Sequence, residues 1–390
     1  MGAVLEINLQ KISENAAAIR RVCGSHGIEV LGVTKGFSAL PEVVSAILEG
    51  GIDKLADARL ENIRMLREEG FENPMTLLRI PMISRADRVV EYADCSLNSE
   101  LPTLEALSAA AVRAGKEHDV ILMLELGDLR EGMYPRDALQ MMESSIHLPG
   151  IRIKGIGTNM GCYGGILPTK QNLTMLCYLA NALEHYTGMS LETVSGGGTS
   201  SLTLIERGVM PKRVNQVRIG EGLLLGTDTT NHSAIDWLHR DAFRLQAEVV
   251  EVRSKPSVPI GTIGRDAFGN TPQFEDRGIR RRAIIALGRQ DVPPEGIIPL
   301  DRGVKVLGGS SDHIILDIED AEENYKVGDR IEFDLKYQGM LHLCSSRYVK
   351  KVYTREKFGK EVRHDCRNAG AGTAADDHGG LLCEKAGHRQ

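Results

Sequence analysis

The chain of 390 residues is short of aromatic side chains and carries no excess of positive charge. Aromatic residues make up 4% of the sequence, with Trp237 as the single tryptophan, and the formal net charge is −6 at pH 7. Proteins that bind nucleic acid need a positive surface for the phosphate backbone, and no basic patch in this chain suggests one. The composition therefore argues against nucleic acid, or another polyanion, as the main partner.

Long hydrophobic runs are also missing. No apolar stretch approaches the roughly 18–20 residues of a membrane-spanning helix. The N-terminal segment turns polar at Glu6, so we expect no signal peptide. Neither feature predicts a membrane as a partner.

Cysteine is sparse and shows no paired pattern. The seven cysteines are odd in number and scattered, without a CxxC pair, and the histidines and cysteines after residue 356 match no zinc-binding spacing. This pattern predicts reduced thiols in a cytoplasmic compartment and no metal site. We interpret the first five cysteines as buried small hydrophobic residues. They are Cys23, Cys95, Cys162, Cys177 and Cys344.

What the sequence does contain is a regular alternation of strand-like and helix-like segments over its first two-thirds. Apolar strands without clean alternation, separated by helices, indicate a parallel sheet that is covered on its outer face. Eight such units over residues 1–232 match a (β/α)8 barrel. An open doubly wound sheet is the alternative, but no GxGxxG turn follows the first strand. The candidate strands are residues 29–34, 54–58, 76–80, 95–98, 119–126, 151–158, 192–196 and 214–219, and the clearest helix patterns are 8–22, 41–49, 100–114 and 170–186.

After about residue 240 the pattern changes. Short β-rich segments punctuated by glycine and proline predict a smaller antiparallel β domain over residues 240–353, without a long helix. These segments are residues 244–253, 282–288, 304–308, 313–318, 330–335 and 348–353. The tail at 356–390 is rich in Gly, Ala and Asp and has no periodic pattern, so it is predicted to be disordered.

Lys35 ends the first strand, immediately before a turn. In a (β/α)8 barrel the active site forms at the C-terminal ends of the strands. A lysine at that position loses hydration, which lowers the pKa of its amine, and Schiff-base formation requires a neutral amine. On position alone Lys35 could equally be a solvated surface lysine, so its assignment depends on the other strand ends.

Glycines and hydroxyl side chains follow the seventh strand. The run at 195–201 lets the backbone approach an anion closely, and its hydroxyl groups precede a helix N-terminus. A second glycine-containing turn follows the eighth strand, and these two loops are the usual phosphate site of the barrel. A glycine run alone could serve only to make a tight turn. The candidate cofactor-binding residues are Ser195, Gly197, Gly198, Thr199, Ser200, Gly220 and Glu221.

An imine-forming lysine and a phosphate cradle at one barrel mouth together indicate pyridoxal 5'-phosphate as the cofactor. On these residues the chain resembles the fold-type III pyridoxal-phosphate enzymes, within them the alanine/ornithine racemase family, and it looks most like the ornithine/lysine racemase branch. The resemblance covers about residues 3–353. The matching pieces are Glu6-Ile-Asn-Leu, Val33-Thr-Lys35, Arg130-Glu-Gly-Met, Gly157-Thr-Asn159, Ser195-Gly-Gly-Gly-Thr, Val217-Arg-Ile-Gly, Ser310-Ser-Asp-His313 and Val327-Gly-Asp.

The resemblance implies an amino-acid racemase, an isomerase that interconverts L- and D-amino acids. Lys35 would bind the cofactor and then serve as the base on one face of the substrate α-carbon. Arg218 falls where these racemases place an arginine against the pyridine nitrogen, which stays unprotonated because an arginine keeps its own proton. Asn159 falls beside the cofactor ring, where similar enzymes often hold a histidine. Arg130 is the candidate for binding the substrate carboxylate.

The second face of the α-carbon needs its own acid/base. In alanine racemase a tyrosine from the partner subunit's β domain fills this role, which implies a homodimer with shared active sites. The corresponding stretch here, 258–269, contains no tyrosine. His313 is the candidate replacement, with Asp312 as a substrate-binding neighbour, although a histidine after such a turn is often structural. The other candidates are Asp266, Tyr337 and Tyr348.

The family branch points to ornithine or lysine as the substrate, or to a broad range, with alanine as an alternative. A basic substrate side chain would need a carboxylate, for which the candidates are Glu125, Asp128, Asp291 and Asp312. Three other functions make different predictions. A decarboxylase of the same fold would have an acidic residue in place of Arg218, a non-catalytic cofactor-binding protein would lack 240–353, and a barrel aldolase would need no phosphate loop.

Overall fold

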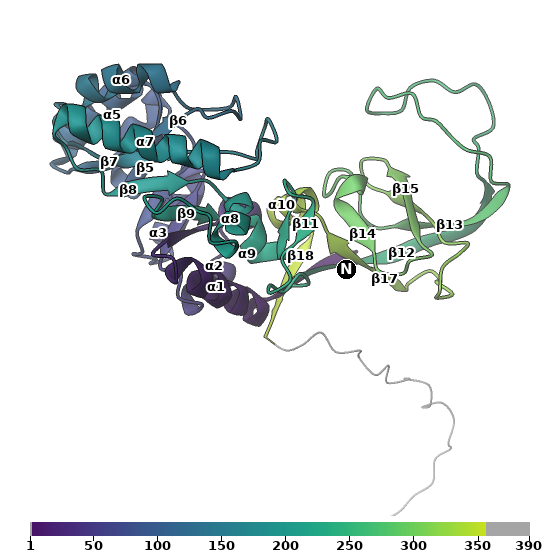
Figure 1. Ribbon diagram of the computed structural model, residues 1–390. Coiled ribbons are helices and arrows are strands. Elements are labelled where there is room, and N and C mark those ends of the chain that lie inside the picture. The colour runs from purple at the N-terminus through teal and green to yellow at the C-terminus, as the bar shows by residue number, and fades with distance from the viewer. Residues whose placement is uncertain (1, 356–390) are drawn as a thin grey trace, which may run out of the picture. The chain divides into compact units, whose positions relative to one another are not determined.

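The computed structural model describes residues 2–355 (Figure 1). Its first large element is a closed barrel of eight parallel strands, as the sequence predicts. The barrel closes where the first of these strands pairs with the last, with Leu31 opposite Arg218. The strands are β2 (Glu29–Val33), β3 (Lys54–Asp57), β4 (Met75–Leu77), β5 (Cys95–Asn98), β6 (His118–Leu124), β7 (Ile151–Thr158), β8 (Thr193–Gly196) and β9 (Gln216–Ile219).

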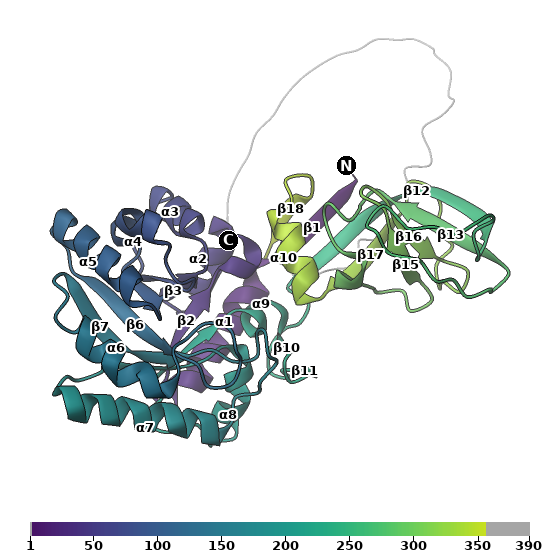
Figure 2. The ribbon, with the colours of Figure 1, turned by 90° about the horizontal axis from the view of Figure 1, so that it is seen from above.

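Helices connect the barrel strands and lie around them (Figure 2). Their ends follow local sequence signals. The longest helix begins with a capping box between Thr169 and Asn172, and another ends at Gly115, which adopts φ +60°. The helices are α1 (Leu9–Gly24), α2 (Pro41–Glu49), α3 (Leu60–Glu68), α4 (Ala86–Tyr92), α5 (Leu101–Ala114), α6 (Ala138–Ser145), α7 (Lys170–Thr187), α8 (Leu202–Glu206) and α9 (Glu221–Leu225).

A separate, mainly antiparallel sheet forms the second part of the fold, again as predicted. Its long strand β12 carries a bulge between Val249 and Glu251; the part before the bulge pairs with β1 and β17, and the part after it with β13. The strands are β1 (Ala3–Asn8), β12 (Phe243–Pro256), β13 (Ile279–Ile285), β14 (Ile297–Pro299), β15 (Lys305–Gly309), β16 (Ile314–Asp317), β17 (Arg330–Leu335) and β18 (Lys350–Thr354). The short pair β10 (Thr227–Asp228) and β11 (Ser233–Ala234) lies apart from this sheet.

The N-terminal strand belongs to this second sheet, a placement that the sequence did not predict. β1 pairs antiparallel with β12 and parallel with β18. The chain thus starts in the sheet, forms the barrel, and returns to the sheet. Strand β1 is buried along nearly its whole length, which carries no information about which sheet it joins.

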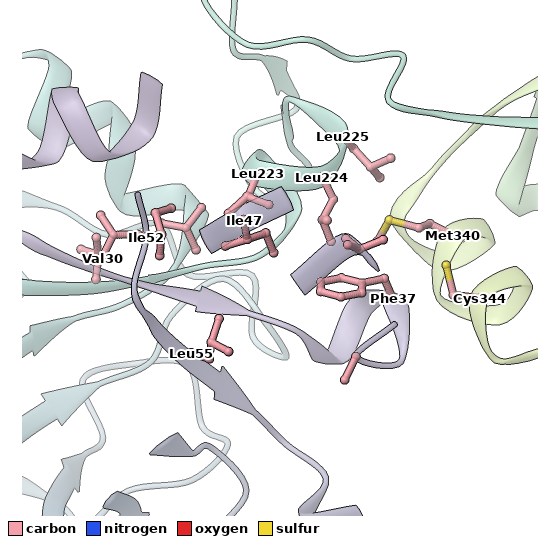
Figure 3. Packing of buried hydrophobic residues seen from close by; sticks show 14 of the residues in the cluster. Val30, Phe37, Ile47, Ile52, Leu55, Leu223, Leu224, Leu225, Met340 and Cys344 are labelled. Carbon is pink, nitrogen blue, oxygen red and sulfur yellow. The ribbon is translucent and has the colours of Figure 1, made fainter. Parts of the chain in front are cut away.

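The second part contains a nine-residue helix, which agrees with the expectation of no long helix but was not located from the sequence. Helix α10 (Tyr337–Ser345) follows β17 and packs against the turn after β2. Gly339 has a low helix propensity, so the sequence pattern did not indicate a helix here. The glycine is nevertheless required, because a Cβ there would lie 2.1 Å from the carbonyl oxygen of Gly296. Figure 3 shows the result, with Phe37 packed near Met340 of α10 and Leu224 of α9.

Within residues 2–355, no helix is both long and apolar enough to cross a membrane. The predicted tail at 356–390 lies outside the described residues.

Candidate active site

The C-terminal ends of four barrel strands bring the predicted site residues to one mouth. Lys35 follows β2, Asn159 follows β7, the glycine run begins in β8, and Arg218 lies in β9. The neighbouring strands are in register there, with Gly157 of β7 opposite Ser195 of β8. This is the end of the barrel at which a (β/α)8 enzyme builds its active site.

Lys35 lies at the start of a short 3-10 turn, Lys35–Phe37, and the two residues after this turn have unusual backbone geometry. Ser38 and Ala39 both adopt left-handed conformations, with φ of 53° and 51°. Such conformations cost energy for residues other than glycine and cluster at functional sites. Before the turn, the Thr34 hydroxyl donates a 2.5 Å hydrogen bond to the buried carboxylate of Asp57, which ties the end of β2 to the end of β3.

Burial lowers the pKa of the Lys35 amine from its ordinary value. The charges of Cys162, Asp57 and Glu131 oppose this change, whereas that of Arg130 adds to it. Burial also raises the pKa of the Asp57 carboxyl group. The amine is therefore more readily neutral than that of a surface lysine, which is the state that Schiff-base formation needs.

Arg218 is buried, with 6% of its surface exposed. Its guanidinium donates to the Ser195 hydroxyl, to the Thr158 carbonyl at 2.8 Å and to Asn159 Oδ1 at 3.5 Å. Burial lowers the pKa of Arg218 to about 10, so the group stays charged at neutral pH. Within residues 2–355 it forms no ion pair, and so one charge is left for a ligand in the mouth.

The two carboxylates near β9 are engaged elsewhere. Glu221 accepts hydrogen bonds from the hydroxyl of Thr227 at 2.8 Å and from the backbone N–H of Thr229 at 3.0 Å. Asp228 accepts from the backbone N–H and the side chain of Asn231. Glu221 therefore holds the loop after α9 in place, and its predicted contact with a cofactor stays a prediction.

The glycine run forms a close-packed cradle. Gly197 adopts φ +100°, and a Cβ on it would lie 2.9 Å from Ser201 Oγ. Thr199 Oγ1 accepts a 3.2 Å hydrogen bond from the Gly222 N–H, which joins the loops after β8 and β9. In the described part of the chain, the N–H groups of Gly198 and Thr199 find no acceptor. Free backbone donors in a glycine cradle suit a phosphate group.

Asn159 adds an unsatisfied donor at the same mouth. Its Oδ1 accepts from Arg218, but its buried Nδ2 has no acceptor among the described residues. A buried amide without a partner costs free energy, so its presence indicates a bound group that supplies one. With Lys35, Arg218 and the glycine cradle, it makes the residues present fit pyridoxal phosphate.

The loop between β6 and α6 closes another side of the mouth. Arg130 pairs with Glu131 through both Nε and Nη2. Burial lowers the pKa of Arg130, but the bond to Glu131 and the charges of Glu131 and Asp128 together outweigh burial, so that the pKa is raised. Leu129, just before this pair, adopts a left-handed φ of 53°. The predicted carboxylate-binding arginine thus lies at the mouth, with its guanidinium held by a neighbouring glutamate.

Two further side chains at the mouth are those of Cys162 and Tyr337. The expectation that Cys162 is buried was wrong: it is exposed, and a thiolate there would act electrostatically on Lys35, Arg130 and Arg218. Its place in the glycine-rich segment after the sixth barrel strand was the available signal. Tyr337, weighed in the sequence only as a second base, comes from α10, and its ring would contact a Cβ on Gly36 at 3.4 Å.

His313 and Asp312 lie elsewhere in the chain. Both are exposed and precede β16 of the second sheet, where Asp312 accepts a 2.6 Å hydrogen bond from Ser311. Within the described chain they are not brought to Lys35. Their predicted roles would require a second copy of the chain and remain predictions.

A parallel barrel whose mouth gathers a half-buried lysine, a buried arginine and a glycine cradle defines a pyridoxal-phosphate enzyme. The chain belongs to the alanine racemase family, since residues 7–228 match the model of the alanine racemase N-terminal domain. It is 41% identical to ornithine racemase of Acetoanaerobium sticklandii over 89% of this chain and 98% of that protein. It is 42% identical to lysine racemase of Thermotoga maritima over 90% and 98%.

Solved structures agree on the fold. The alanine racemase of Clostridium difficile 630 superposes with a TM-score of 0.71 at 20% identity, covering 91% of this chain and 96% of that one. The alanine racemase of Bartonella henselae with covalently bound pyridoxal phosphate gives a TM-score of 0.69 at 16% identity, covering 90% and 99%. The family and the relatives together make this chain a pyridoxal-phosphate-dependent amino-acid racemase, an isomerase.

Proposed function

We propose that the enzyme racemises diamino acids, ornithine or lysine, in the cytoplasm. The relatives of about 40% identity that span nearly the whole chain support this substrate class. The observation that carries the reaction type is Arg218, which lies buried at the end of β9 and contacts no carboxylate there. A decarboxylase of this fold would have an acidic residue at that position. The free thiols of the described chain support a reducing compartment.

Pyridoxal phosphate supplies the electron withdrawal that lets the α-proton of a bound amino acid leave. The glycine run would hold its phosphate, Arg218 and Asn159 would border its ring, and Lys35 would anchor it. Once the substrate has taken its place, the neutral Lys35 Nζ takes up or returns the α-proton on one face. Arg130 would bind the substrate carboxylate and so orient the α-carbon.

For the opposite face we propose His313 from a second subunit, in a homodimer with shared sites. The exposure of His313 on the second sheet supports this role. Cys162 is the second candidate, favoured by its exposed position at the mouth of the same chain. Tyr337 suits a proton donor better than a base, because burial raises its pKa to about 12 and keeps the phenol protonated.

A panel of single L-amino acids tests the proposal. The purified holoenzyme should abolish the optical rotation of L-ornithine or L-lysine faster than that of L-alanine, with no release of carbon dioxide. Equal rates on all three would indicate a broad racemase. A preference for alanine would replace the diamino-acid proposal, and carbon dioxide without racemisation would contradict the reaction type.

A further inference from the structure

Six carboxylates lie around the mouth, and the structure commits five of them to the fold, among them Asp228 through its bonds from Asn231. Asp57 accepts from the hydroxyl of Thr34, from the backbone N–H of Arg59 at 2.7 Å and from the amide of Asn62 at 3.0 Å. Glu221 accepts from the side chains and backbone of the loop after α9. Releasing Asp57 would leave the buried Thr34 hydroxyl without its partner, at a cost of about 1–3 kcal/mol, and releasing Glu221 would free the loop after α9.

Two carboxylates expected from the sequence to serve a basic substrate are committed in the same way. Glu125 is buried and accepts from the N–H groups of Gly127 at 2.5 Å and Arg130 at 3.1 Å. Asp128, only 1% exposed, accepts from the N–H groups of Tyr163 and Gly164, both at 3.1 Å. Both therefore shape the loops around the mouth.

Glu131 is different. Its side chain is 20% exposed, and in the described chain its hydrogen bonds come from the guanidinium of Arg130 alone. Within residues 2–355, no backbone N–H and no hydroxyl donates to it. It lies in the loop between β6 and α6 at the barrel mouth, and its charge also acts on Lys35 and Arg218. Glu131 is therefore the mouth carboxylate that can change partners without breaking the fold.

We propose that Glu131 binds the side-chain ammonium of a diamino-acid substrate. Before binding, Arg130 and Glu131 neutralise each other. On binding, the substrate carboxylate takes the guanidinium fork of Arg130, and the substrate ammonium takes the carboxylate of Glu131. One ion pair is exchanged for two, and no partly buried charge is left alone.

The same exchange selects against amino acids with neutral side chains. When such a substrate takes Arg130, the Glu131 carboxylate loses its partner in a partly buried place, which is unfavourable. Discrimination would thus come from a penalty on the wrong substrate as well as from a contact with the right one. This inference rests on the proposed diamino-acid function and names the residue that would produce it.

The test compares L-ornithine with L-norvaline, which has the same carbon chain without the ammonium. Glu131→Gln should lower kcat/KM for L-ornithine at least tenfold and leave that for L-norvaline unchanged or higher. The control is Glu143→Gln, which removes one exposed charge from α6 and should leave both values unchanged. An equal loss for both substrates in Glu131→Gln would overturn the inference, because Glu131 would then act only by positioning Arg130.

A second variant keeps the charge. Glu131→Asp withdraws the carboxylate by one methylene, so the ratio of kcat/KM for L-lysine to that for L-ornithine should rise, and an unchanged ratio would contradict the inference. If Glu131→Gln fails to bind cofactor, the lysine-to-ornithine ratio of Glu131→Asp still tests the inference, because this variant keeps the carboxylate. A wild-type enzyme that racemises neither diamino acid would defeat the proposed function itself, whereas a wild-type preference for ornithine that survives in Glu131→Gln would defeat only this inference.

Discussion

At the scale of single residues, the site favours the neutral amine of Lys35 and the charged guanidinium of Arg218. Burial drives both effects, since it lowers the pKa of Lys35 and that of Arg218. The outcomes differ because an ordinary lysine titrates near pH 10.4 and an arginine above pH 12. A similar burial therefore favours a neutral Lys35 and still leaves Arg218 protonated at neutral pH.

The lowered pKa of Lys35 makes a pH prediction. As the pH rises through the pKa, the amine loses its proton and becomes able to bond with the cofactor aldehyde. Stripped of cofactor, the protein should recover its cofactor absorbance at a rate that rises with pH and levels off below pH 10.4, the midpoint of an exposed lysine. A midpoint at or above that of an exposed lysine would contradict the burial argument.

Sequence alone located Lys35, Arg218 and the glycine run, because strand ends and glycine runs are local patterns. It could not locate Glu131 as a candidate, since the other carboxylates are excluded only by hydrogen bonds between distant loops. It also missed the exposure of Cys162, because burial depends on the path of the loop around it.

At the scale of elements, the barrel strands were predictable to within two or three residues because they alternate with helices and most of them contain a buried apolar core. Helix α10 was not, because Gly339 weakens its helical pattern and the reason for the glycine lies in Gly296, far along the chain. Strand β1 was missed for a related reason, since its partners β12 and β18 lie more than 230 residues away.

The glycine cradle makes a prediction at this scale. Gly197→Ala adds a Cβ at φ +100° and 2.9 Å from Ser201 Oγ, so the loop must open and the affinity for pyridoxal phosphate should fall roughly tenfold or more. Spectroscopic titration of the apoprotein would measure this. Gly208→Ala is the matched control, since Gly208 also has a positive φ, +64°, but a Cβ there would contact nothing within 4 Å.

The control should lose about 1 kcal/mol of unfolding free energy and keep its cofactor affinity. If both variants bound the cofactor as tightly as the wild type, the run after β8 would be a turn without a role in phosphate binding.

At the scale of the whole molecule, the second sheet gathers distant parts of the chain. The first strand and the last described strand pair within it, with Val4 opposite Lys350, and α10 carries it to the turn that holds Lys35. The site is therefore not a property of the barrel alone. We propose that a second subunit completes the site, and this proposal needs an experiment with two chains.

Mixed dimers test that completion. Lys35→Ala and His313→Ala should each be inactive alone. Refolded together, they should regain about a quarter of the wild-type activity, because a random mixture makes hybrid dimers with one intact site. No recovery would contradict a role for His313 across the interface. If Cys162→Ala were inactive as well, and also failed to complement Lys35→Ala, the second acid/base would be assigned to Cys162 of the same chain.

The central claim is that Lys35 holds the cofactor of this racemase, and borohydride reduction tests it most directly. The reduction fixes the cofactor to whichever lysine it occupies, and mass spectrometry of the digested protein then identifies the peptide. We predict one modified lysine, Lys35, and none in Lys35→Ala. A modified peptide that contains any other lysine, or a Lys35→Ala protein that still carries the label, would contradict the account.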